Sequence, residues 1–178
     1  ALFIDPDGPY PRMPDVDCWD EERDAFKFNG DNPVICHPPC GPWGNMAHFS
    51  QQDPSGGPFA VSVVQRNGGV LEHPARSKLW KHLALPAPGQ PPDAFGGYSV
   101  YVEQVSYGHV TRKPTWLYIV RAPLPVLKTG GQPTHAIRRT TKLNARGMRI
   151  PGCSKLERRI TPAPFALLLV HIARSVEQ

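Results

Sequence analysis

Long apolar runs are missing from this sequence of 178 residues, and so is a secretion signal. The longest apolar run near the C-terminus, from Phe165 to Val170, is far shorter than the roughly 18 residues that a membrane-spanning helix needs. The N-terminus carries no basic region followed by a small-residue cleavage site. We therefore expect no membrane contact and a cytoplasmic location.

Cysteine is scarce as well, with four residues at Cys18, Cys36, Cys40 and Cys153. In the reducing compartment expected here, four scattered cysteines do not predict a disulfide framework. The pattern Cys36-His37-x-x-Cys40 has the spacing of half a zinc site. Its remaining ligands would have to come from Cys18, His48 or Cys153, which form no second ligand pair, so we expect no metal.

Acidic residues become rare toward the C-terminus. Residues 1–37 carry nine acids and three bases, residues 38–127 four acids and seven bases, and residues 128–178 two acids and ten bases. A solvated surface is the simple interpretation, and a phosphate-binding surface is the functional one, because clustered Lys and Arg release counterions from nucleic acid. We expect nucleic-acid contacts within 128–160, from Arg138, Arg139, Lys142, Arg146 and Arg149.

Proline and glycine are abundant, at 22 and 16 residues, which excludes long uninterrupted helices through most of the chain. The apolar runs between them resemble short strands, so we expect an ordered single domain over 1–178. Strands are expected at 2–4, 33–36, 70–71, 98–107 and 115–120. Short helices are expected at 19–28, 58–67, 77–83 and 164–176, with Pro/Gly loops between. This alternation predicts an open α/β sheet, reduced and Rossmann-like.

In such a sheet the ligand lies outside the carboxyl ends of the strands. Asp5, Cys40 and Glu72 each follow closely after a predicted strand, so we expect them to line one crevice. Cys40 stands in a rigid Pro-Pro-Cys-Gly-Pro turn, which favours a nucleophile over a buried structural thiol and calls for a neighbour that stabilises the thiolate. Glu72 is the expected acid or hydrogen-bonding group, with His73 as the alternative.

Four segments together resemble one enzyme family. Val34-Ile35-Cys36-His37-Pro38-Pro39-Cys40 resembles the Pro-Cys catalytic loop of the cytosine-C5 DNA methyltransferases. Val70-Leu71-Glu72-His73-Pro74 is similar to their strand that ends in Glu-Asn, and the stretch from Tyr107 to Val120 to their basic segment and following strand. Arg159 to Val176 is similar to their closing segments. The chain resembles short bacteriophage or prophage relatives that lack the target-recognition domain and the glycine-rich cofactor loop.

The resemblance implies a mechanism and a set of ligands. The Cys40 thiolate would add to C6 of a flipped cytosine, Glu72 would hydrogen-bond N3 and the exocyclic amine, and Arg112 would contact the base carbonyl or a phosphate. It implies S-adenosylmethionine as cofactor, held by Phe3, Asp5, Asp17 and Pro38, and a DNA contact from Lys113. The partner would be DNA or a pyrimidine nucleotide.

Three functions stay open at this point. The first is a minimal cytosine-C5 methyltransferase. The second is a relative that uses the same Cys40 and Glu72 pair with another donor, or for deamination. The third is a nucleic-acid-binding protein without catalysis, which would use the basic C-terminal third.

Overall fold

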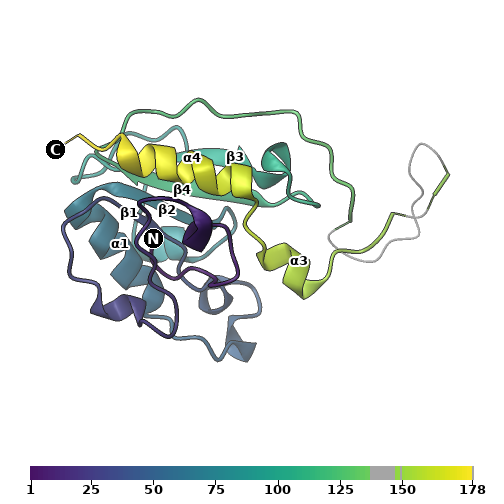
Figure 1. The fold of residues 1–178 in the computed structure, drawn as a ribbon, viewed down its shortest axis with the longest axis horizontal. Helices are drawn as coiled ribbons and strands as arrows, with labels where there is room; N and C mark the ends of the chain where they lie inside the picture. Colours follow the sequence, from purple (N-terminus) through teal and green to yellow (C-terminus); the bar gives the residue numbers. More distant parts are fainter. Residues whose placement is uncertain (137–146, 149, 178) are drawn as a thin grey trace.

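The computed structural model describes residues 1–136, 147–148 and 150–177. It is a mixed α/β structure built on a four-stranded open sheet in the order β1-β2-β4-β3 (Figure 1). The strands are β1 (Val34–Cys36), β2 (Gly69–Pro74), β3 (Tyr98–Glu103) and β4 (Pro114–Val120). β1 and β2 are parallel, whereas β4 runs antiparallel to both β2 and β3.

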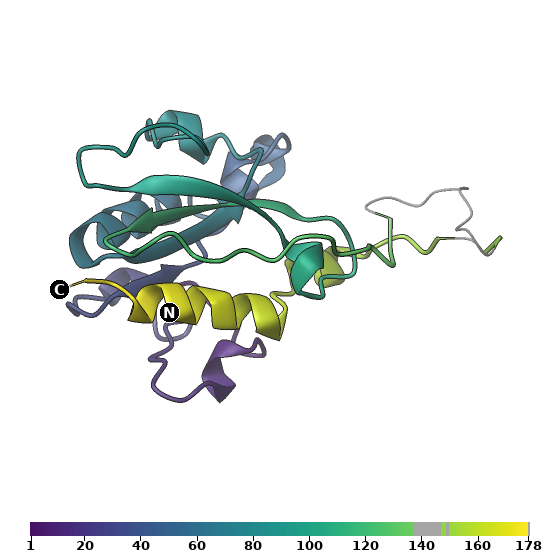
Figure 2. The same cartoon turned by 90° about the horizontal axis from the view of Figure 1, so that it is seen from above.

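Helices lie on both faces of this sheet. Figure 2 shows α1 (Gly56–Asn67) and α4 (Ala163–Arg174) on opposite sides of the strands. Two shorter helices are α2 (Leu79–His82) and α3 (Lys155–Arg159). Five 3₁₀ turns complete the described elements, at η1 (Tyr10–Arg12), η2 (Ala25–Lys27), η3 (Gly41–Trp43), η4 (Ala47–Phe49) and η5 (Gln104–Tyr107). Among the described residues, no helix is long and apolar enough to cross a membrane.

The alternation of side chains along each strand divides the core into two halves. Ile35, Val70 and Leu117 face the half that α4 covers, where Phe165 and Leu169 are fully buried. Their neighbours along the strands belong to the half that α1 covers, namely Val34, Cys36, Leu71, Tyr118 and Val120. Because both faces are covered, the ends of the strands are where polar side chains can meet a ligand.

The parallel pair β1 and β2 has a tight glycine contact at its start. The register joins Val34 to Gly69 and Cys36 to Leu71. Gly69 has a φ of +117°, and a Cβ there would lie 2.0 Å from the Val34 carbonyl oxygen. Glycine is therefore the residue that lets the two strands approach at this register.

The N-terminal residues extend the sheet beyond β1 by single bridges. Leu2 pairs in parallel with Cys36 on one side and with Trp19 on the other. The expected strand at 2–4 is limited to this one residue, because Phe3 has a φ of 58° and leaves the extended conformation. Leu2 is nevertheless fully buried and continues the core that α1 covers.

Most of the other predicted elements are confirmed, with corrected ends. Helices at 58–67, 77–83 and 164–176 correspond to α1, α2 and α4. The predicted helix at 19–28 is wrong: Asp24 has a φ of 60°, and its side chain accepts from the Phe26 amide to cap the short η2. The predicted strand at 98–107 ends at Glu103. Helix α3 was not predicted, although Ser154 and Glu157 form its capping box.

Replacing Gly69 by alanine tests the close approach of β1 and β2. The added Cβ would overlap the Val34 carbonyl and carry an unfavourable φ, so we expect a loss of about 3 kcal/mol or more in unfolding free energy. Gly89→Ala is the control, because Gly89 also has a positive φ but no atom within 4 Å of the added Cβ, and it should cost about 1 kcal/mol. Chemical denaturation measures both, and equal losses would contradict the steric argument.

Candidate active site

The register of β1 and β2 brings His37 and Glu72 together. Cys36 pairs with Leu71. The next residues along the two chains, His37 and Glu72, therefore lie side by side. Both continue the strand face of Ile35 and Val70, because side chains alternate along a strand. The His37 Nδ1 atom lies 3.0 Å from Glu72 Oε2.

This contact is the centre of a chain of polar side chains that runs through the interior. Tyr10 Oη lies 2.7 Å from His37 Nε2 on one side. On the other, Gln104 Nε2 donates to Glu72 Oε1 at 3.0 Å and to Thr115 Oγ1 at 3.0 Å. Tyr10, Glu72, Gln104 and Thr115 are all buried, and the His37 side chain is 12% exposed. The two oxygens of Glu72 are thus each held by one donor.

Glu72 is ionised in this setting. Burial by itself would raise the pKa of Glu72, but the His37 hydrogen bond and the charge of Lys113 outweigh it and hold the pKa at about 2. An ionised carboxylate accepts hydrogen bonds, so the proton of a neutral His37 lies on Nδ1. Its Nε2 then accepts from the Tyr10 hydroxyl, which keeps its proton because burial raises the pKa of Tyr10.

Cys40 stands at the exposed end of the loop that follows β1. It precedes the 3₁₀ turn η3, and its carbonyl accepts from the Trp43 amide at 3.2 Å. Gln52 holds the turn from outside by accepting from the Gly41 amide at 3.2 Å. These contacts and the flanking prolines fix the position of the thiol.

The thiol is not activated in the resting state. Packing of protein around the Cys40 sulfur raises its pKa, and the negative charge of Glu72 raises it further. Lys113 and Arg159 act in the opposite direction but do not outweigh these two effects. A reactive Cys40 needs a neighbour that stabilises its thiolate. The positive charges of Lys113 and Arg159 do so, whereas the negative charge of Glu72 opposes the thiolate. Glu72 and Cys40 are close enough to influence each other electrostatically.

His73 points to the opposite face from Glu72. It is fully buried, and its ring packs edge-on against Trp80 at 6.0 Å between ring centres. Burial lowers the pKa of His73 to about 4, although Glu72 and the Pro39 carbonyl favour its charged form. A neutral imidazole beneath the Pro38-Pro39-Cys40 loop supports the loop by packing.

The two basic residues before β4 differ in their surroundings. The Arg112 side chain is 63% exposed and donates to Glu103 at 2.6 Å. Lys113 is half-buried, and its charge acts on both Cys40 and Glu72. Lys113 is therefore the cation of the crevice, whereas the contact of Arg112 with a base stays a prediction.

The four residues predicted to hold the cofactor already have protein partners or are buried. Phe3 packs against Phe26, with ring centres 5.4 Å apart, in an aromatic cluster. Asp5 accepts from the Asp7 amide at 3.0 Å, and Asp17 pairs with Arg23 and accepts from Trp19 Nε1 at 2.8 Å. Pro38 is buried in the loop after β1. A cofactor contact at these four residues stays a prediction.

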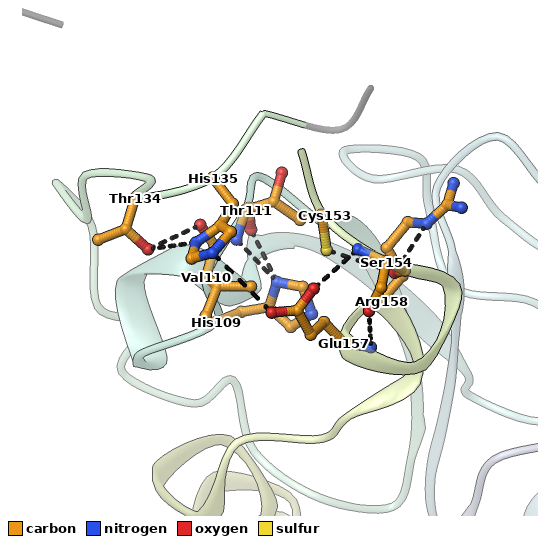
Figure 3. A network of polar contacts seen from close by, with 9 residues as sticks. All are labelled: His109, Val110, Thr111, Thr134, His135, Cys153, Ser154, Glu157 and Arg158. Atoms are coloured by element: carbon orange, nitrogen blue, oxygen red, sulfur yellow. Dashed lines mark hydrogen bonds and ion pairs between the residues drawn. The ribbon is translucent and has the colours of Figure 1, made fainter. Parts of the chain in front are cut away.

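Arg138, Arg139, Lys142, Arg146 and Arg149 lie outside the described residues. The chain on either side of them is joined at Ala136 and Gly152, which form a parallel bridge. Figure 3 shows the polar contacts around this junction, where His135 lies 3.9 Å from Glu157 and Ser154 caps α3. In the described part of the chain, no three His, Cys, Asp or Glu residues are grouped as metal ligands.

No family model, curated protein or solved structure matches this chain. The functional argument therefore depends on the geometry of the crevice and on the chemistry of its side chains.

Sequence reasoning missed Tyr10, His37, Gln104 and Thr115 as parts of the site. The sequence pattern placed Gln104 and Thr115 in ordinary strands, and no motif distinguishes them. His37 could have been found from the strand pairing. Once Cys36 pairs with Leu71, the next residues, His37 and Glu72, must lie side by side.

The pKa of His73 predicts how the fold responds to acid. In the unfolded chain this group titrates near 6.5, against about 4 in the folded protein. The unfolded state therefore binds more protons between these values, so stability should fall as pH drops through this window, by up to about 3 kcal/mol. His73→Phe keeps the packing on Trp80 and should remove most of that loss.

Denaturant unfolding at a series of pH values measures this dependence. The same change at exposed His48 is the control and should leave the pH dependence of wild type. An unchanged slope in His73→Phe would show that the buried imidazole is not its source.

Proposed function

We propose that the protein is a pyrimidine-modifying enzyme that acts at C5 of cytosine, in DNA or a nucleotide, through a covalent adduct of Cys40 with C6. Transfer of a one-carbon group, most simply a methyl group, is the favoured reaction. The observation that carries the proposal is an exposed cysteine, on a fixed turn after β1, within the electrostatic reach of an ionised and doubly held carboxylate inside the neighbouring parallel strand β2.

The two side chains fit the two needs of this chemistry. Glu72 can accept a hydrogen bond from the exocyclic amine of cytosine and share a proton, taken up from solvent, with N3. This makes C6 more electrophilic. The Cys40 sulfur then bonds to C6 while its own proton leaves to solvent, and the electron pair of the C5–C6 double bond moves to C5.

The second half of the reaction restores the pyrimidine. C5 forms a bond to the one-carbon group while the bond between that group and the rest of the donor breaks, and the donor leaves with that electron pair. The C5 proton then passes to solvent, its electron pair re-forms the double bond, and the bond between sulfur and C6 breaks to release Cys40 as the thiolate. Lys113 is placed to favour the thiolate that leaves, because its charge lowers the pKa of Cys40.

The donor is the less supported half of the proposal. Phe3, Asp5 and Asp17 have protein partners, so their contacts do not favour S-adenosylmethionine over another donor. A folate one-carbon donor is the alternative.

We also propose that the sheet is a reduced Rossmann-like one. Leu2 has Trp19 on one side, toward the edge of the sheet. On its other side it has β1, which is followed by β2. Such a reversal between Leu2 and β1 is where open α/β sheets bind their ligands, outside the carboxyl ends of the strands. Cys40 follows β1 at this point, and this supports the placement of the crevice.

A cytosine carrying fluorine at C5 tests the chemistry directly. Fluorine cannot leave as the C5 proton does, so the adduct should persist as a covalent complex once the donor step has occurred. We expect a complex with a 5-fluorocytosine oligonucleotide in the presence of the correct donor. Cys40→Ser should abolish it, and Glu72→Gln should slow it by roughly 10²–10⁴-fold, as for a positioned acid–base group.

Separate reactions with S-adenosylmethionine and with a folate donor identify the donor, and denaturing gels or mass spectrometry detect the complex. Cys36→Ala is the control, because Cys36 is fully buried and burial raises its pKa to about 12. Bound oligonucleotide without an adduct, with any donor, would rule out the enzyme in favour of a binding protein.

That second function, nucleic-acid binding without catalysis, has a specific observation in its favour. A hollow of about 570 Å³ is lined by Arg76, Ser77, Lys78, Lys81 and His82. It adjoins the Cys40 turn, since the Lys78 amide donates to the Trp43 carbonyl at 2.9 Å and the rings of Trp43 and His82 lie 5.0 Å apart. Clustered exposed cations of this kind suit a phosphate backbone.

Replacing Lys78 and Lys81 together by glutamine tests the hollow. Each phosphate contact contributes about one unit to the slope of log affinity against log salt, so the double variant should lose up to about two units. Fluorescence anisotropy with a labelled oligonucleotide measures the slope. Arg12→Gln combined with Lys27→Gln removes the same charge from the acidic N-terminal region and should leave the slope nearly unchanged. Equal slopes in the two double variants would exclude the hollow as a phosphate site.

A further inference from the structure

Glu72 is held more firmly than hydrogen bonding to a substrate requires. His37 occupies one carboxylate oxygen and Gln104 the other, at 3.0 Å each, and both contacts form without any ligand. His37 is itself fixed by Tyr10 on its far nitrogen, at 2.7 Å. The position of the carboxylate is thus set from three elements: the loop after β1, the η1 turn and the start of η5.

The charge on this carboxylate acts on the nucleophile. The hydrogen bond from His37 and the charge of Lys113 favour an ionised Glu72. The ionised Glu72 in turn opposes ionisation of Cys40, while Lys113 and Arg159 favour it. Burial of the sulfur is the larger cause of the raised Cys40 pKa, and Glu72 is the negative charge that adds to it, so removing that charge would shift the balance at the sulfur toward the thiolate.

We propose that His37 is a positioning residue that keeps Glu72 ionised in the empty site and so holds Cys40 as an unreactive thiol until a pyrimidine engages the carboxylate. When Glu72 shares a proton with the ring, its charge is neutralised, and the thiolate forms with the substrate in place. This second step rests on the proposed function; the resting state does not. The arrangement protects an exposed cysteine from alkylation and oxidation between turnovers.

The hydrogen-bond donor on His37 Nδ1 is the feature that matters, so two substitutions separate it from packing. An asparagine at this position can present an amide N–H to Glu72 close to where Nδ1 lies, but it loses the contact with Tyr10. A leucine fills a similar volume and offers no donor. Without the His37 donor, burial shifts Glu72 toward its protonated form against Gln104 and Lys113 alone, and the negative charge near Cys40 decreases.

The rate at which iodoacetamide alkylates Cys40 measures the charge state of the thiol without any substrate. Cys18→Ser removes a half-buried thiol and Cys153→Ser a buried one, and Cys36 is fully buried. Mass spectrometry then follows Cys40 alone over a range of pH. We expect slow alkylation at neutral pH in this background. Glu72→Gln and His37→Leu should accelerate it several-fold to about tenfold, since the rate follows the thiolate fraction.

His37→Asn should stay within about twofold of the background rate, because it keeps a donor to Glu72. Glu103→Gln is the matched control: it removes one acid that pairs with Arg112 and should not change the rate. Circular dichroism verifies that each variant is folded, and Glu72→Gln alone decides the outcome where His37→Leu does not fold. Equal rates in the background and in Glu72→Gln would overturn the proposal, as would a His37→Asn rate as fast as that of His37→Leu.

The experiment separates this inference from the proposed function. If the alkylation rates change as expected but no 5-fluorocytosine adduct forms, the effect of Glu72 and His37 on Cys40 is supported and the proposed reaction is wrong. If the adduct forms but the alkylation rate does not depend on Glu72 or His37, the reaction is supported and the effect on Cys40 is wrong.

Discussion

The parallel pairing of β1 with β2 is the constraint on which the crevice depends. It is made possible by Gly69, whose missing side chain lets the Val34 carbonyl approach. The register that results places His37 next to Glu72 and starts the Cys40 loop beside the end of β2. A shift by one residue would turn Glu72 toward the opposite face, because side chains alternate along a strand.

A buried carboxylate is costly unless its charge is compensated, and the structure compensates Glu72 from several directions. Hydrogen bonds come from His37 and Gln104, and Lys113 adds a positive charge. Satisfying a buried charge in this way rigidifies it, which is the condition for orienting a flat heterocycle. The same fixed charge raises the pKa of Cys40, so the hydrogen bonds that position Glu72 also affect the thiol.

Covering both faces of the sheet restricts where chemistry can occur. Helices α1 and α4 bury the two faces, so the loops at the strand ends carry the exposed reactive groups. Prolines before and after Cys40 keep its turn from varying, and buried His73 lies under that turn. The basic hollow at residues 76–82 begins just after β2, so a surface suited to phosphate adjoins the thiol.

The sequence by itself determined the elements whose signal is local. Apolar runs and Pro/Gly breaks were enough for α1, α2, α4, β1 and β4, and they singled out Cys40 and Glu72 as candidate site residues. They placed Glu72 just after a strand at 70–71, whereas β2 continues through Glu72 to Pro74, because β4 pairs with it there. Local backbone reversals at Phe3 and Asp24 were not visible, because a positive φ at a residue other than glycine has no strong sequence signal. Only the tertiary structure decided that His37 and Gln104 hold Glu72 and that Tyr10 holds His37. These residues come from separate segments and meet through strand register and side-chain direction. The state of the thiol likewise depended on tertiary structure, because the charges that set a pKa act through space and not along the chain.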